Sequence, residues 1–197
     1  MMSERDISRG CKQGKANAQR ALFDRYSPIL MAKIFSYVGN DDDAKDVLQD
    51  TFIKAYTTID RFAWAGDGSL QAWLTRIAVN TAINFLRSRK RLVVTTVSAT
   101  DMDDPPDVVE EATVDEVNRL DTSTILEMVA ELPDGYRTVF NLYCLDGYSH
   151  KEIAEQLGIN EKSSSSQLAR AKALLAQKIK KYLNEQNNDY HYEQQYK

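Results

Sequence analysis

The sequence has few of the residues that build disulfide frameworks, metal sites and tight turns. Its 197 residues include two cysteines, two histidines, four prolines and eight glycines. Cys11 and Cys144 lie far apart without a partner pattern, so they predict neither a disulfide framework nor a metal site. No apolar run reaches the roughly 18 residues of a membrane helix, and residues 1–6 lack the apolar core of a signal peptide. We therefore expect a cytoplasmic globular protein without membrane insertion and without a cofactor.

Acidic and basic residues are unevenly distributed along the chain. The net charge is −4, yet residues 1–91 hold 15 Lys and Arg against 10 Asp and Glu, whereas residues 92–131 hold 1 against 11. Pro105 and Pro106 in the acidic stretch disfavour a regular element. The polar C-terminus lacks apolar periodicity. The sequence therefore predicts four segments: a domain at 1–91, a flexible acidic linker at 92–118, a second domain at 119–183 and a disordered tail at 184–197.

Apolar residues recur at helical spacing wherever the sequence predicts regular structure. In the first helix the expected buried stripe includes Ile29 and Leu30, and Ser27-Pro28 predicts a kink or a new start. The alternation typical of strands is absent. The sequence predicts an all-α protein with two small domains, the C-terminal one containing a helix-turn-helix. The expected helices are 16–38, 42–59, 69–89, 119–131, 134–146, 149–157 and 161–183.

The helix-turn-helix is the most specific local pattern. Ser149 and Glu152 have the spacing of a capping box that begins a helix, and Gly158 suits the left-handed residue that ends it. A helical wheel of the next helix turns short polar and basic side chains outward, as major-groove recognition requires. An ordinary two-helix corner with a solvated face is the alternative. The candidate DNA-binding residues are Ser149, Lys162, Ser163, Ser165, Ser166, Ala169 and Arg170.

A second polar stripe follows the third helix of the first domain. Arg76, Asn80, Asn84 and Arg87 are spaced by four, four and three residues, so they share one face. Arg contacts phosphates, and Asn both donates and accepts at a base edge. The preceding loop contains Phe62 and Trp64, and aromatic rings near a basic surface are typical of single-stranded nucleic-acid binding. A solvated face beside core aromatics explains the same pattern.

Four motifs follow one another along the chain, at residues 43–52 (DAKDVLQDTF), 73–80 (WLTRIAVN), 131–140 (ELPDGYRTVF) and 147–154 (GYSHKEIA). Together they resemble the extracytoplasmic-function (ECF) group of bacterial sigma factors, over about 16–91 and 119–183. Val79, Asn84, Ser165 and Lys172 depart from the residues usual in that family, which affects the expected promoter preference.

The resemblance implies a dissociable subunit of RNA polymerase that selects and opens promoters, with an anti-sigma factor as a further partner. By this analogy the acidic linker would occupy the RNA exit channel, and the helix at 161–172 would recognise the −35 duplex. The melted −10 strand would contact Phe62, Arg76, Asn80, Asn84 and Arg87. Core polymerase would contact Asp46, Gln49, Asp50 and Ile53.

Three other protein classes fit the sequence less well. A helix-turn-helix regulator usually binds operator DNA as a dimer, and the sequence has no heptad seam. An enzyme needs a convergent constellation, and His150 and His191, in a capping box and in the polar tail, provide none. An anti-sigma or adaptor protein would explain the acidic linker but not two basic nucleic-acid faces.

Overall fold

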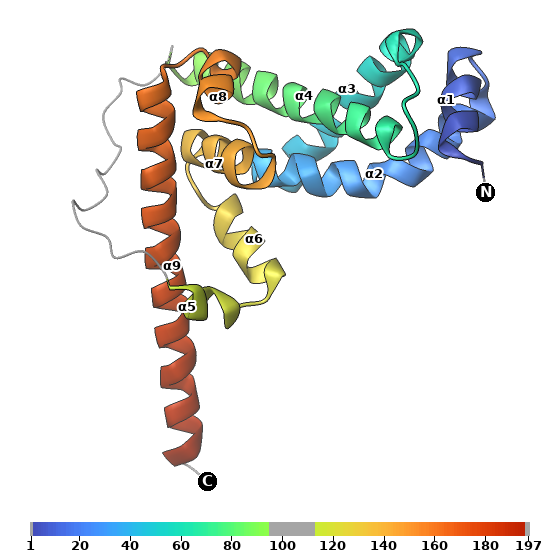
Figure 1. The fold of residues 1–197 in the computed structure, drawn as a ribbon. Helices are drawn as coiled ribbons and strands as arrows, with labels where there is room; N and C mark the ends of the chain where they lie inside the picture. Colours follow the sequence, from blue (N-terminus) through green and yellow to red (C-terminus); the bar gives the residue numbers. More distant parts are fainter. Residues whose placement is uncertain (1, 95–112, 196–197) are drawn as a thin grey trace. The chain divides into compact units, whose positions relative to one another are not determined.

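The computed structural model describes residues 2–94 and 113–195, and every regular element within them is a helix (Figure 1). The chain divides into two compact units between residues 97 and 98. The all-α class with two helical domains is thus confirmed. We call the described residues 2–94 domain 1 and 113–195 domain 2. None of the helices in these two ranges is long and apolar enough to cross a membrane.

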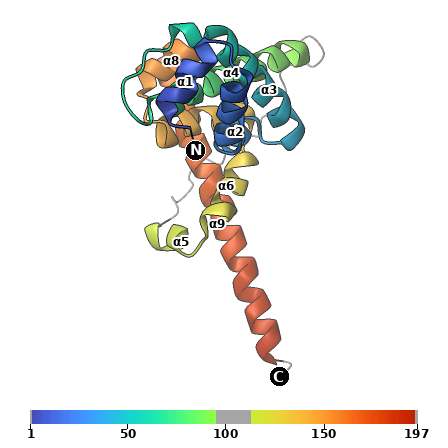
Figure 2. The same ribbon diagram turned by 90° about the vertical axis from the view of Figure 1, so that its right-hand side faces the viewer.

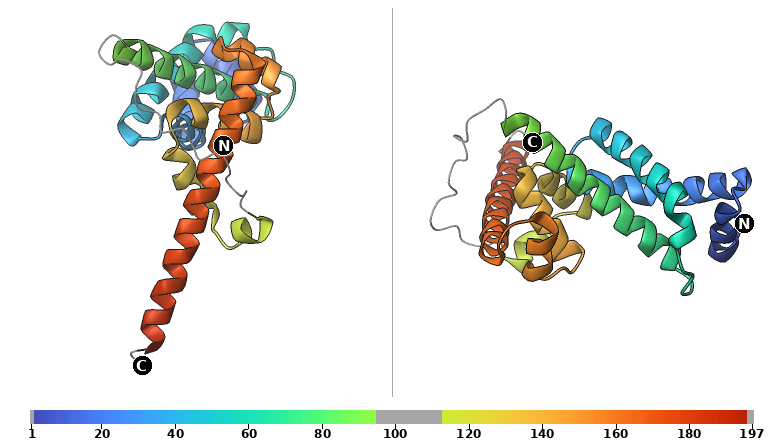
Figure 3. Two further views of the ribbon diagram at one scale, coloured as in Figure 1. Left: turned by 90° about the vertical axis from the view of Figure 1, so that its left-hand side faces the viewer. Right: turned by 90° about the horizontal axis from the view of Figure 1, so that it is seen from above.

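Domain 1 consists of three long helices that contact one another in pairs, with a short helix on one of them (Figure 3). The short helix α1 packs on α2 and was not predicted, because Ile7 and Cys11 are its only buried apolar residues. The elements are α1 (Glu4–Lys12), α2 (Ala16–Val38), α3 (Asp41–Thr58), the 3-10 turn η1 (Ile59–Arg61) and α4 (Ser69–Val94).

Helix α2 corrects two expectations. It continues through Pro28 as one helix, so of the predicted kink or new start at Ser27-Pro28 the new start does not occur. Its buried stripe runs through Leu22, Tyr26 and Leu30 in steps of four residues. Ile29 falls beside that stripe and is 47% exposed, contrary to the prediction. Helical periodicity alone does not distinguish Ile29 from Leu30 as the buried residue. Leu30 is the one buried because α2 packs against α3 and α4.

In domain 2 the short helices pack along the N-terminal part of one long helix, and Figure 2 shows that helix extending beyond them. Met128 and Val129 of α6 and Leu132 of the α6–α7 connection meet Ala171 and Leu175 of the long helix in a common core. The elements are α5 (Val114–Asn118), α6 (Thr122–Ala130), α7 (Asp134–Phe140), the π-helical turn η2 (Asn141–Leu145), α8 (His150–Leu157) and α9 (Glu161–Gln195).

The predicted linker and tail differ from the structure at their ends. Helix α4 extends to Val94, and α5 begins at Val114, both inside the predicted linker, whose residues 95–112 lie outside the described residues. Helix α9 continues to Gln195, although disorder was predicted from residue 184. Adding residues to an existing helix costs far less than nucleating one, and the Lys181–Glu185 ion pair at 3.8 Å supports the extension.

Candidate nucleic-acid and protein-binding surfaces

The polar stripe on α4, formed by Arg76, Asn80, Asn84 and Arg87, is exposed at all four positions, as its spacing predicted. Helix α4 contacts both α2 and α3, which fixes its orientation. Even the polar residue on its buried side has partners, because the Thr81 hydroxyl donates to the Ile77 carbonyl at 2.8 Å and accepts from Lys54 at 3.2 Å. The buried residues of α4 are Leu70, Leu74, Ala78, Val79, Thr81, Ala82, Ile83 and Leu86.

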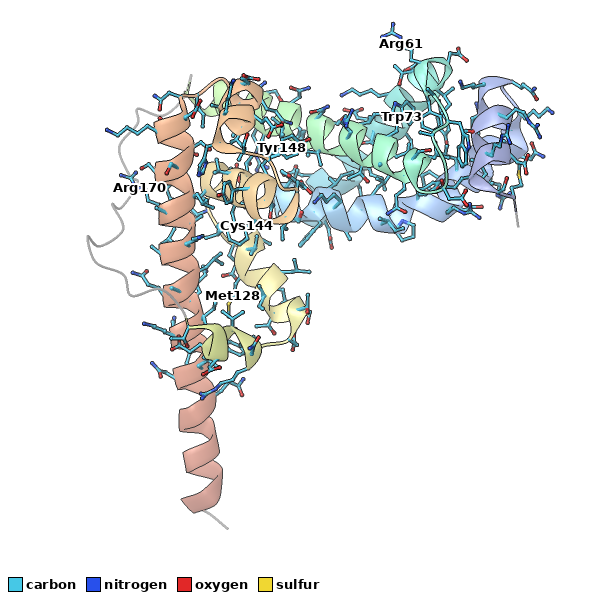
Figure 4. The ribbon with its side chains drawn as sticks, viewed as in Figure 1. Arg61, Trp73, Met128, Cys144, Tyr148 and Arg170 are labelled. Atoms are coloured by element: carbon cyan, nitrogen blue, oxygen red, sulfur yellow. The ribbon has the colours of Figure 1, made fainter. Side chains whose placement is uncertain are left out.

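The exposure of the aromatic residues near the stripe differs from the prediction. Phe62, expected to stack on a base, is only 4% exposed. Its ring packs against Trp73 with the centroids 5.4 Å apart, so it is unavailable for stacking. Trp73, labelled in Figure 4, is only half-buried and lies three residues before Arg76, a spacing that places it on the same face of α4 as the stripe. The partly accessible aromatic rings here are therefore those of Trp64 and Trp73, not that of Phe62.

Two further features of α4 limit its positive charge. Val79, at a position where the resemblance leads one to expect an Arg, is 5% exposed and belongs to the core. The Arg89 guanidinium forms an ion pair with the Asp43 carboxylate at the start of α3. Residues 87–91 (RSRKR) form a basic run. Within it, the charge of Arg89 is already paired with that of Asp43. Arg76 and Arg87 carry the positive charge of the stripe itself.

One face of α3 exposes a mixed acidic and apolar surface. Asp46, Gln49, Asp50 and Ile53 are all exposed, and Ile53 is 53% exposed. Phe23 of α2, also largely exposed, lies against α3 with its ring centroid 4.8 Å from that of Phe52. A single exposed apolar residue is common, but Ile53 on α3 and Phe23 against α3 are both exposed beside carboxylates, and exposed apolar side chains rimmed by polar ones are typical of protein-binding surfaces. Sequence spacing found the four α3 residues but not Phe23, which belongs to another helix.

The first turns of α9 expose most, but not all, of the predicted DNA-binding residues. Lys162, Ser165, Ser166 and Ala169 are exposed. Ser163 is half-buried, and its backbone N–H donates to the Asn160 side chain, 2.7 Å away, which caps the helix. Lys172 is also exposed on this helix; the sequence analysis named it only as a departure from the family.

Arg170 corrects the helical-wheel prediction. The wheel turned it fully outward, but the side chain is half-buried, and its Nη1 donates to the Tyr136 hydroxyl of α7 at 3.4 Å. Tyr136 itself is buried in the core of domain 2. Arg170 therefore lies at the edge of the α9 face, with its orientation set by α7. Figure 4 labels it beside α9.

Hydrogen bonds at the start of α8 cap this helix and join it to α9. The Ser149 hydroxyl donates to Glu152 Oε2 at 2.7 Å and accepts from the Glu152 N–H at 3.3 Å, so the predicted capping box is present. Ser149 therefore has a structural role. His150 Nδ1 lies 3.0 Å from Oγ of Ser164 on α9, and its ring stacks on Tyr143 with centroids 4.5 Å apart. Gly158 ends α8 at a φ of 67°.

Comparisons with known proteins match both domains. Residues 22–92 match the family model for sigma-70 region 2, and residues 123–175 match that for sigma-70 region 4. The ECF RNA polymerase sigma-E factor of Haemophilus influenzae is 30% identical over 180 residues, covering 85% of this chain and 90% of that protein. The RNA polymerase sigma factor SigV of Bacillus subtilis is 31% identical over 141 residues, covering 72% and 78%.

Among solved structures, the sigma factor RpoE in complex with the anti-sigma factor NepR from Bartonella quintana overlaps with a TM-score of 0.47 at 23% identity, covering 82% of this chain and 96% of that one. The region 2 model thus matches domain 1, the region 4 model matches domain 2, and the relatives are matched over most of their lengths. The chain belongs to the ECF sigma factors of the sigma-70 family.

Proposed function

We propose that this sigma factor assigns promoter opening to the α4 stripe, −35 recognition to the first turns of α9 and polymerase docking to the exposed face of α3. As a member of its family it is an initiation factor that directs core RNA polymerase to promoters, not an enzyme. The observation that supports the assignment best is the exposed line of two Arg and two Asn on α4, backed by a core on α2 and α3.

The chemistry of the α4 stripe suits a melted strand. The guanidinium groups of Arg76 and Arg87 can contact phosphates, while Asn80 and Asn84 can donate to and accept from an unpaired base. Trp73, half-buried at one end of the stripe, offers part of a ring for stacking, an interaction worth about 1–3 kcal/mol per base in other proteins. Phe62 has no such role because its ring is buried.

Replacing Asn80 tests the melting role. Asn80→Ala should leave the thermal midpoint nearly unchanged, since the side chain is exposed. The holoenzyme should still bind duplex promoter through domain 2 yet open it poorly, and a template premelted over its −10 segment should recover only part of the activity. Asn17→Ala, an equally exposed Asn on α2, is the matched control. Normal promoter opening by Asn80→Ala would contradict the proposal.

The first turns of α9 suit duplex DNA. Lys162 can contact a phosphate, whereas Ser165, Ser166 and Ala169 are short enough for the helix to approach base edges in the major groove. Arg170 lies at the edge of this face and donates to the Tyr136 hydroxyl; a guanidinium has five donors, so a contact with DNA is compatible with that bond. Ser149 would contribute by holding α8 in place through its cap.

The α3 face suits a protein partner better than DNA. Asp46 and Asp50 repel phosphates, and Ile53 gains from being covered. Ile53→Arg should strongly reduce the amount of core polymerase that copurifies with the sigma factor. Asp42→Ala, on the first turn of the same helix with its side chain 98% exposed, should not. Undiminished copurification by the Ile53 variant would place the docking surface elsewhere.

We further propose a cytoplasmic location, where core polymerase and promoter DNA meet, and regulation by an anti-sigma factor, as the family resemblance implies. Immunodetection after cell fractionation tests the location, and recovery in the periplasmic fraction would contradict it. Copurification from cells, with the α3 face intact or altered by Ile53→Arg, tests for a regulatory protein that competes with polymerase.

A further inference from the structure

Helix α1 holds the loop that leads into α4 at both of its ends. At the first end, Lys12 Nζ donates to the Phe62 carbonyl at 2.6 Å and lies 3.4 Å from the Asp60 carbonyl. At the other end, Glu4 Oε2 accepts from the backbone N–H of Gly68 at 2.7 Å. Two charged side chains, eight positions apart on one short helix, therefore bind main-chain groups on either side of residues 63–67.

The helix that makes these two contacts is itself firmly attached to domain 1. The second carboxylate oxygen of Glu4 accepts from the Tyr26 hydroxyl at 2.6 Å, and Tyr26 is only 2% exposed. Gly10 allows α1 to approach α2 closely, because a Cβ there would lie 2.5 Å from Cβ of Ala18. The loop is thus tied to the core of the domain through Glu4.

Between its two anchors the loop exposes a short tip. Ala63, Ala65 and Asp67 are exposed, and Trp64 is half-buried. The Ser69 hydroxyl donates to the Gly66 carbonyl at 2.6 Å and so joins the end of the tip to the first turn of α4. The start of the loop packs behind the stripe, since Phe62 contacts Trp73. The tip therefore adjoins the aromatic end of the α4 stripe.

We propose that Glu4 and Lys12 are positioning residues for promoter opening, which fix the tip of loop 62–68 beside the α4 stripe and thereby set which bases of the melted strand it accepts. This inference rests on the proposed role of the stripe. In this proposal neither Glu4 nor Lys12 touches DNA. Their contribution is preorganisation: a loop already held in one conformation loses less freedom on binding a strand than a loop that is free.

Hydrogen exchange tests the two anchors without reference to activity. In the full-length protein, Glu4→Gln and Lys12→Met should make amides of residues 62–69 exchange about tenfold faster, because each removes a charge-assisted hydrogen bond. The exchange of α2 and α3 should not change. Arg9→Ala, which removes an exposed charge from the same helix, is the matched control. Glu4→Gln keeps the size of the side chain and an acceptor for Tyr26, which protects folding.

Transcription then tests the positioning role. Holoenzymes are compared on promoters that carry each of the four bases at every −10 position. Glu4→Gln and Lys12→Met should reduce the preference between bases severalfold while binding to −35 duplex stays unchanged, and Lys12→Arg, which keeps a donor and the charge, should restore most of the preference. A merely structural role would lower activity on all promoters equally, and that result would overturn the proposal.

The remaining outcomes separate this inference from the function on which it rests. Unchanged exchange in the loop would overturn the anchoring by α1, whatever the promoters do. Faster exchange with an unchanged base preference would overturn the positioning role when Asn80→Ala still impairs opening. If Asn80→Ala is also without effect, the proposed role of the α4 stripe fails, and the positioning role fails with it.

Discussion

The two domains of this ECF sigma factor are stabilised in different ways. Domain 1 joins its helices through tyrosine side chains: the buried Tyr26 donates to Glu4 of α1 and the half-buried Tyr56 of α3 donates to the Gln19 carbonyl of α2. Burial first of all raises the pKa of both phenols to about 12. Domain 2 builds short helices whose first turns are capped. There hydrogen bonds from the N-caps Thr113 and Ser149 lower the pKa of the exposed Glu116 and Glu152 carboxyls, and hydrogen bonds from Ser123 and Thr124 lower that of Asp121, which is itself an N-cap.

Helix length explains this difference. Helices α5 to α8 have five to nine residues, too few to be stable alone. Helices α2, α3 and α4 have 18 to 26 residues and bury one side against each other. The surface for melted DNA is thus backed by a continuous core, whereas the helix-turn-helix depends on caps and on α9. The domains should therefore unfold separately and respond to different changes.

Removing a core side chain should have the largest effect and should be confined to one domain. Leu74 and Ile153 are fully buried in domains 1 and 2, and truncation of such residues costs about 2–5 kcal/mol. Trp64 and Trp73 are the only tryptophans of the chain, so fluorescence reports domain 1 alone, while circular dichroism reports both. Leu74→Ala should lower the urea midpoint of the fluorescence transition. Ile153→Ala should leave that midpoint unchanged and shift only the part of the circular-dichroism transition that belongs to domain 2. Coincident shifts would show that the domains unfold together.

Most of the fold could be predicted from the sequence because long amphipathic helices have a strong periodic pattern. The bounds of α2 were predicted without error, and those of α3 to within one residue at each end. Helix α1 was missed because it has only nine residues, and its two buried apolar residues, Ile7 and Cys11, are too few to establish a helical period. Its existence depends on contacts with α2, above all the close approach at Gly10, and these contacts are set by tertiary structure.

The candidate surfaces were predictable where all their residues share one helix. The α4 stripe and the α3 face follow from spacing alone, and both are exposed. Phe62 and Arg170 were misjudged because their environments come from elsewhere in the chain. Phe62 packs on Trp73 of the next helix, and Arg170 bonds to Tyr136, 34 residues away. A helical wheel contains no information about such neighbours.

Arg170 allows DNA contact and packing to be separated within domain 2. Arg170→Ala should weaken binding to −35 duplex by about 1–3 kcal/mol if the side chain contacts a base, with core polymerase binding unchanged. Tyr136→Phe keeps the ring in the core and removes only the hydroxyl that Arg170 bonds. It should cost less, since the guanidinium keeps its charge and its reach. Equal losses for the two variants would show that Arg170 acts through its orientation by Tyr136.

Removing a helix cap compares the domains directly. Ser149→Ala should destabilise domain 2 by about 0.5–2 kcal/mol, the usual cost of losing an N-cap. Asn40 caps α3 in domain 1 with its side chain 2.9 Å from the Asp43 N–H. Asn40→Ala should cost less, because the Asp43–Arg89 ion pair still holds the first turn of α3. Urea midpoints from fluorescence and circular dichroism provide the measurement, and a larger loss for Asn40→Ala would reverse the comparison.

Alkaline pH should destabilise domain 1. The ordinary pKa of a tyrosine is 10.0, and that of Tyr26 is raised to about 12, so the unfolded chain loses this proton first. The stabilisation is complete below pH 10 and is lost as the pH rises towards about 12. Tyr26→Phe should flatten this fall in the tryptophan-detected urea midpoint, with Tyr56 accounting for the part that remains. An unaltered pH dependence would mean that Tyr26 ionises equally in both states.

Acid should destabilise domain 2, to a smaller extent than alkali destabilises domain 1. The pKa of Glu152 is lowered first by the backbone N–H of Ser149 and then by its hydroxyl. A carboxyl with a lowered pKa stabilises the fold above its ordinary value of 4.5, and this stabilisation is lost as the pH falls through the lowered value. The effect is small because the carboxylate is fully exposed to solvent.

Glu152→Gln should slightly lower the domain 2 midpoint at neutral pH and make it less sensitive to acid, while the tryptophan-detected midpoint of domain 1 keeps its pH dependence. A parallel change in both domains would show that the capping box does not act locally.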